Sequence, residues 1–162
     1  MKRIDCQGFT NLEIIITVII IGVITAIGAP SLYNLRLQTQ LKNDTKNLEN
    51  IIQLALANID RKSRNCTITI PAGAGQTITS NNNCLQESFT FEDHVVTNNI
   101  VLAFSYRGAL QSEQTLILSS NASGVSDQYC ITFGFLGTIR SGQWIGGTCR
   151  NLFNLGYDNG NF

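Results

Sequence analysis

Residues 13–36 read EIIITVIIIGVITAIGAPSLYNLR, and this stretch decides the architecture of the chain. The 22 positions between Glu13 and Arg36 carry no charge. At about 1.5 Å per residue they make a helix of roughly 33 Å, enough to cross a hydrocarbon core of about 30 Å. Twelve of the fourteen residues from Ile14 to Ile27 are β-branched, but lipid offers the backbone no partner strand, so a helix is expected. We predict that residues 9–35 span a membrane.

A cleaved secretory signal is the alternative. Lys2 and Arg3 would be its charged region, and Ala26-Ile27-Gly28 would be a small-x-small cleavage site. A polar stretch at residues 5–11 separates the charges from the apolar run, and Pro30 follows the supposed cut, where it would hinder a peptidase. Retention of the helix is therefore favoured.

The composition describes one domain with balanced charge. The chain has 162 residues, with 11 Lys and Arg against 11 Asp and Glu, and 43% of its residues are hydrophobic. This length is enough for one hydrophobic core. The balance excludes a basic fold that coats nucleic acid, and the apolar fraction excludes a disordered polyelectrolyte.

An acid stands at the entrance of the apolar run. Glu13 at the edge of a spanning helix costs about 1–3 kcal/mol, so it needs a compensating partner or must reach the headgroup level. It closes the motif Gly8-Phe9-Thr10-Asn11-Leu12-Glu13, which follows a short basic leader.

This motif, with the apolar run to Pro30, resembles the class III signal of type IV prepilins and type II secretion pseudopilins. The resemblance implies that residues 1–8 are a leader, which a prepilin peptidase cuts between Gly8 and Phe9, and that the new amine of Phe9 is methylated. It also implies that Glu13 pairs with the N-terminal amine of a neighbouring subunit, so that the two charges neutralise each other. Asn11-Leu12 departs from the family, which usually has two apolar residues there.

After Pro30 the apolar pattern becomes periodic. The spacing predicts an amphipathic helix over residues 36–64, continuous with the membrane helix, bent at Pro30 and ending at about Arg61. Its apolar stripe consists of Leu41, Leu48, Ile52, Ala55 and Ile59.

Three cations close this helix, namely Arg61, Lys62 and Arg64. Cations at a helix C-terminus interact with free carbonyls and the negative dipole end. We prefer this interpretation to a nucleic-acid contact, because the sequence places no aromatic residue beside the three charges.

The region 65–162 reads as an antiparallel β-sheet head, which makes the fold class α+β with a pilin-like long N-terminal helix packed on the sheet. Turn-like clusters rich in Gly and Asn, the last of them Gly146-Gly147, separate the strands. The tail after Cys149 is expected to be loosely ordered. The expected strands are 66–70, 76–79, 89–96, 100–106, 115–119, 129–135 and 138–144.

Short motifs in this region resemble the head of the general-secretion-pathway protein H and FimT family of minor pilin-like proteins. They are Phe104 to Gly108, Thr115 to Leu118, Ile131 to Phe133 and Gly137 to Arg140. Some FimT-like members are implicated in DNA uptake through a Gly-Arg-x-Arg loop. Here Gly137-Thr138-Ile139-Arg140 keeps only the second arginine of that loop. Arg140 and Arg150 are the candidate DNA contacts.

Five cysteines become four once the leader with Cys6 is removed. An even number outside a membrane indicates disulfides among Cys66, Cys84, Cys130 and Cys149. Three connectivities are possible, and we favour Cys66 with Cys84 and Cys130 with Cys149, because both close local loops. No Cys-x-x-Cys motif and a single histidine argue against zinc.

No catalytic motif is present, so we predict that the chain is not an enzyme and needs no cofactor. On an expected strand, His94 would share a face with Glu92 and not with Asp93, and a surface role is favoured over acid–base catalysis. Arg107 and Arg140 stand at apparent strand–turn junctions, where structural pairing is favoured over ligand contact.

These features together predict a minor type IV pilin-like structural subunit. It would sit in the inner membrane with its head in the periplasm and then join a pilus with other pilin subunits. A type II secretion pseudopilin and a DNA-uptake minor pilin are the alternatives.

Overall fold

The computed structural model describes residues 9–151, without the side chains of residues 26–30 and 151. The leader, with Gly8 and Cys6, and the tail from residue 152 lie outside the described residues. The chain divides into two compact units, Met1–Arg36 and Leu37–Phe162. We call the second unit the head.

Helix α1 spans Asn11–Lys62, close to the expected end at Arg61. Pro30 lies within α1, whose backbone is helical on both sides of it, and the bend expected there stays a prediction. In the first unit, the described apolar side chains of α1 are exposed, among them Ile14, Ile19 and Ile24. None of the helical segments that the structure describes combines the length and hydropathy needed to cross a bilayer.

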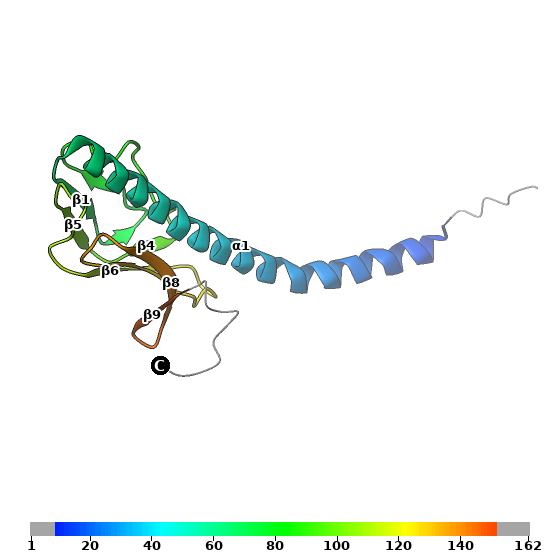
Figure 1. The fold of residues 1–162 in the computed structure, drawn as a ribbon. Coiled ribbons are helices and arrows are strands. Elements are labelled where there is room, and N and C mark those ends of the chain that lie inside the picture. The colour runs from blue at the N-terminus through cyan, green and yellow to red at the C-terminus, as the bar shows by residue number, and fades with distance from the viewer. Residues whose placement is uncertain (1–8, 152–162) are drawn as a thin grey trace, which may run out of the picture. The chain divides into compact units, whose positions relative to one another are not determined.

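In the head, the later half of α1 lies along the strands (Figure 1). The expected apolar stripe is confirmed, since Leu41, Leu48, Ile52, Ala55 and Ile59 are all buried in one core with the strands. The gap of seven between Leu41 and Leu48 is filled by Thr45, which is also buried and whose hydroxyl donates to the Leu41 carbonyl at 2.8 Å.

Within residues 9–151, nine strands form two antiparallel sheets, one in the order β3-β1-β5 and the other in the order β2-β4-β6-β7-β8-β9. The strand bounds are β1 Cys66–Ile70, β2 Gly73–Ala74, β3 Thr79–Ser80, β4 Val95–Thr97, β5 Ile100–Phe104, β6 Gln114–Ser120, β7 Tyr129–Phe133, β8 Ile139–Ile145 and β9 Thr148–Asn151. The fold class α+β with an antiparallel sheet is therefore confirmed.

Two expected strands are mostly irregular. Segments 76–79 and 89–96 face each other through one bridge, Thr77 with Thr90, and only short ends of them belong to β3 and β4. Their side chains Ile78 and Phe91 are buried, so the apolar signal that suggested strands came from core packing rather than from a continuous ladder.

The expected turn at Gly146-Gly147 is confirmed, but the strand after it was missed. Both glycines have positive φ, at 60° and 84°, which is the geometry of a two-residue hairpin. Ile145 then pairs with Thr148, and β9 continues to Asn151. Arg150 and Asn151 form ladder pairs with Gln143 and Gly142 of β8. The expectation of a loosely ordered tail directly after Cys149 is therefore wrong for these two residues.

Both favoured disulfides are present, Cys66–Cys84 with Cα atoms 5.9 Å apart and Cys130–Cys149 with Cα atoms 5.8 Å apart. The second one joins β7 to β9 and passes over β8, which lies between them. The residue opposite Cys130 on β8 is Gly142, which has no side chain to obstruct the link.

Candidate functional site

The N-terminus of α1 is closed by a reciprocal cap. The amide of Glu13 donates to the Thr10 hydroxyl at 3.3 Å, and the amide of Thr10 donates to the Glu13 carboxylate at 3.4 Å. This is the capping box of the pattern Thr-x-x-Glu, which satisfies two helix-end donors at once. This cap is not among the predictions from the sequence, although the spacing from Thr10 to Glu13 carries the capping signal.

The apolar face that follows this cap is uncovered in the single chain. Phe9 is 77% exposed, and every large aliphatic side chain described from Leu12 to Ile24 is exposed as well. The polar groups within this face satisfy themselves, because the hydroxyls of Thr17 and Thr25 donate to carbonyls of their own helix at 2.8 and 2.9 Å. An apolar helix with no unsatisfied hydroxyl suits apolar surroundings.

The two candidate DNA contacts do not share a face of the sheet. Arg150 on β9 is the direct partner of Gln143 on β8, so these two residues lie on the same face. Arg140 lies three positions from Gln143 on the same strand, and strand pleating places it on the opposite face. Both arginines are exposed, but they do not form one contact surface.

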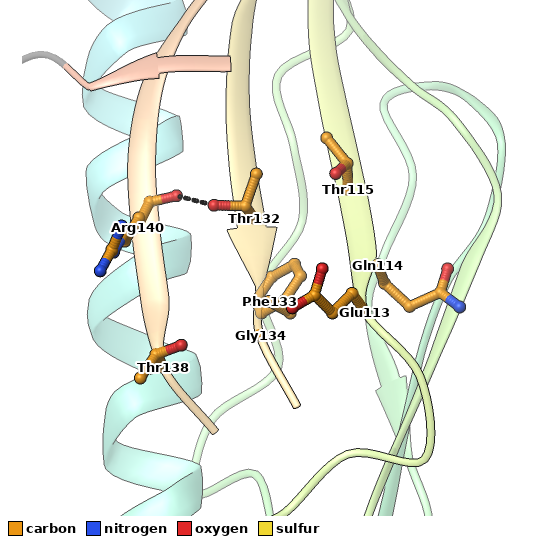
Figure 2. Close-up of a pocket in the computed structure, with 8 residues that line it drawn as sticks. All are labelled: Glu113, Gln114, Thr115, Thr132, Phe133, Gly134, Thr138 and Arg140. Atoms are coloured by element: carbon orange, nitrogen blue, oxygen red, sulfur yellow. Dashed lines mark hydrogen bonds between the residues drawn. The ribbon is translucent and has the colours of Figure 1, made fainter. Parts of the chain in front are cut away.

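Arg140 borders a polar cavity of about 380 Å³ at the start of β8 and β6. Thr115, Thr132 and Arg140 are direct cross-strand neighbours on its wall. Figure 2 shows that the Arg140 guanidinium extends away from Thr132 and Thr115, while the backbone carbonyl of Arg140 accepts a hydrogen bond from the Thr132 hydroxyl at 3.3 Å. The cationic group therefore does not converge with the hydroxyls on one ligand position.

An acidic group is half-buried where α1 meets the turn before β4. Burial raises the pKa of Asp44 above its ordinary value of 3.8, and the nearby Glu92 charge raises it further. The amide of Glu92, which donates to the Asp44 carboxylate at 3.5 Å, and the nearby His94 lower it.

The structure places His94 in a turn, not on the expected strand, because the ladder begins only at Val95. Its Nε2 atom is buried and finds no hydrogen-bond partner among the described residues. No set of three or more metal-binding side chains comes together in the described part of the chain.

The cations at the end of α1 are exposed at the start of the connection to β1. Arg61 and Lys62 belong to the last helical turn, where they face the negative dipole end. The amide of Tyr106 donates to the side chain of Asn65, the residue after Arg64, at 2.8 Å, so the backbone at Tyr106 lies beside this connection. Long-range pairing of β1 with β5 creates this proximity, and no local sequence signal announces it.

Structural comparison gives two similar solved structures, both of one protein. Two crystal structures of the type IV minor pilin FimU from Pseudomonas aeruginosa strain PAO1 match with TM-scores of 0.53 and 0.50, each at 12% sequence identity. The matches cover 72% and 67% of this chain and 96% of each FimU chain. No family model and no curated protein sequence matches. The chain thus has a pilin-like fold, similar to that of a minor type IV pilin.

Proposed function

We propose that this chain is a minor type IV pilin-like structural subunit, anchored in the inner membrane by residues 9–35 with its head in the periplasm and then assembled into a pilus. The observation that carries the proposal is a head of minor-pilin-like fold preceded by a helix whose apolar side chains are exposed. Lipid or a bundle of similar helices would supply the surroundings that such a helix requires.

The proposal includes maturation by a prepilin peptidase. Cleavage after Gly8 would leave Phe9 as the methylated first residue and Glu13 as the fifth. Phe9 and Thr10 precede the first helical residue, Asn11. Mass spectrometry of the mature N-terminus tests this step, and a chain that starts at Ala29 would instead indicate a removed export signal.

Glu13 has two possible roles that one substitution separates. Glutamine also completes a capping box, because its amide oxygen can accept from the Thr10 amide. Glu13→Gln therefore keeps the cap and removes only the charge that would neutralise a neighbour's amine. We expect Glu13→Gln to enter filaments far less readily than the parent chain.

Thr10→Val is the matched control, because it removes the capping hydroxyl and leaves the carboxylate. If Glu13→Gln enters filaments as readily as the parent chain and Thr10→Val does not, the role of Glu13 is helix capping alone. The type II secretion pseudopilin shares these features, and the filament that takes up the tagged chain, pilus or pseudopilus, decides between the two systems.

A further inference from the structure

Two tight turns of the head are joined side by side. The amide of Gly108 donates to the Ser105 carbonyl at 2.8 Å, and the amide of Gly137 donates to the Gly134 carbonyl at 3.0 Å. A Cβ atom at Gly137 would collide with the Gly108 carbonyl, so the two backbones approach as closely as glycine permits. The amide of Leu110 also donates to the Phe135 carbonyl at 2.9 Å, and this hydrogen bond fixes the position of the two turns relative to each other.

The two central residues of each turn project from the head. They are Tyr106 and Arg107 in one turn and Phe135 and Leu136 in the other, and we call these four residues the turn-tip knob. Leu136 is 81% exposed, Phe135 is 56% exposed, and the Arg107 guanidinium lies 5.2 Å from the Tyr106 ring centroid. Central turn positions usually carry polar or small residues, so two aromatic residues, a leucine and an arginine together indicate a contact surface.

The head also carries an apolar recess. Ile51 and Leu54 of α1 line it together with Gln86 and Glu87, and its volume is about 100 Å³. Gln86 is held in place by donating to the Asn58 side chain at 3.2 Å. The recess is smaller than the roughly 150 Å³ cavity that accepts benzene, so it suits an aliphatic side chain such as that of Leu136 better than an aromatic ring.

The knob and the recess lie on different flanks of α1. Gly108 of the knob's first turn faces Leu56, with 3.7 Å between a Cβ built on Gly108 and the Leu56 side chain. At 3.6 residues per turn, Leu56 is rotated by about 140° from Ile51 and about 200° from Leu54. The knob of one chain therefore cannot fill its own recess.

We propose that the recess receives the knob of a second copy of this chain, with Leu136 inside it and Arg107 beside Glu87. The size of the recess and the opposite charges at the two surfaces support this occupant. Because the two surfaces differ and lie on opposite flanks, the contact is head-to-tail, and its repetition builds a row or a ring of chains. The inference deepens the proposed function, on which it rests, by naming a contact between neighbouring heads.

Directed cross-linking of the full chain tests the contact. In a Cys6→Ser background in nonionic detergent, Leu136→Cys chains are mixed with Leu54→Cys chains and oxidised. We expect a mixed dimer that neither variant forms alone. Val101→Cys, at a similarly exposed position of β5, replaces Leu54→Cys as the matched control and should not cross-link. Equal cross-linking at Val101, dimers of Leu136→Cys with itself, or no mixed dimer would each overturn the proposal.

A charge exchange tests the pairing of Arg107 with Glu87. Arg107→Glu on the Leu136→Cys chain, or Glu87→Arg on the Leu54→Cys chain, should slow formation of the mixed dimer about fivefold or more, and the two together should restore it. Slowing without restoration refutes the pairing. The cross-linking assay needs no filament, so its result is independent of assembly. If the cross-link is absent but Glu13-dependent assembly is normal, this inference alone is overturned. If the cross-link forms in a chain that never enters filaments, the proposed function alone is overturned.

Discussion

The two disulfides close loops of almost equal length, so removing them separately tests whether loop length or position in the fold sets their contribution to stability. The sequence separations are 18 for Cys66–Cys84 and 19 for Cys130–Cys149. Loop-closure entropy alone assigns about 3 kcal/mol to each. On that basis the two Cys→Ala pairs would lose the same free energy of unfolding.

The structure gives the two links different surroundings. Cys66 and Cys84 belong to the core cluster, so their replacement also leaves empty space in the core. Cys130 is also buried, but its partner Cys149 lies on the edge strand β9, which contributes no residue to the described core cluster. Without its disulfide, β9 can separate from β8 while the core stays folded. Part of the loop-closure entropy then appears in this local opening and does not lower the free energy of global unfolding.

We therefore expect Cys66→Ala/Cys84→Ala to lower the free energy of unfolding by about 3–5 kcal/mol. The corresponding loss for Cys130→Ala/Cys149→Ala should be about 1–3 kcal/mol. Urea unfolding of the full chain in nonionic detergent, followed by circular dichroism, measures both.

Hydrogen exchange of residues 148–150 provides the second readout. Cys130→Ala/Cys149→Ala should raise the exchange rate of the amides at residues 148–150 without changing the exchange rates in β1 and β5. Equal losses for the two pairs, or an unchanged exchange rate in β9, would refute the argument from position in the fold.

Three further predictions address single sites. The pKa of the Asp44 carboxyl is raised in the folded state, so this group makes the folded chain less stable as the pH rises from about 3.8 through its folded pKa. Asp44→Asn removes the ionisable group. The variant should therefore have a higher urea midpoint than the parent at pH 7 but not at pH 3. Gly137→Ala should cost about 2 kcal/mol or more of unfolding free energy and Gly146→Ala about 1 kcal/mol, because both have positive φ but only Gly137 meets a neighbouring backbone. If Arg140 and Arg150 contact DNA, charge reversal of each should weaken salt-dependent binding of a labelled duplex to the full chain, and unchanged anisotropy titrations for both would remove that hypothesis.

Several elements were predictable because their signals are local. The helical period from Leu41 to Ile59 predicted the buried stripe of α1. Short runs rich in Thr, Ile, Val and aromatic residues predicted β1, β5 and β7 within two residues at each end. The glycine pair at 146–147 predicted a turn for the same reason, since positive φ is a property of single residues. The capping box at Thr10 and Glu13 was equally local, and it was missed because Glu13 was considered only as a charge.

Sequence by itself determined the long helix, the α+β class and the favoured pairing of four cysteines, because period, composition and loop length act over short stretches of chain. Only the tertiary structure decided which distant groups meet. It joined the turns at Gly108 and Gly137, separated Arg140 from Arg150 across the sheet, and brought Asp44 beside the turn before β4. These outcomes depend on the register between strands far apart in the chain, where a shift of one residue exchanges the two faces of a sheet.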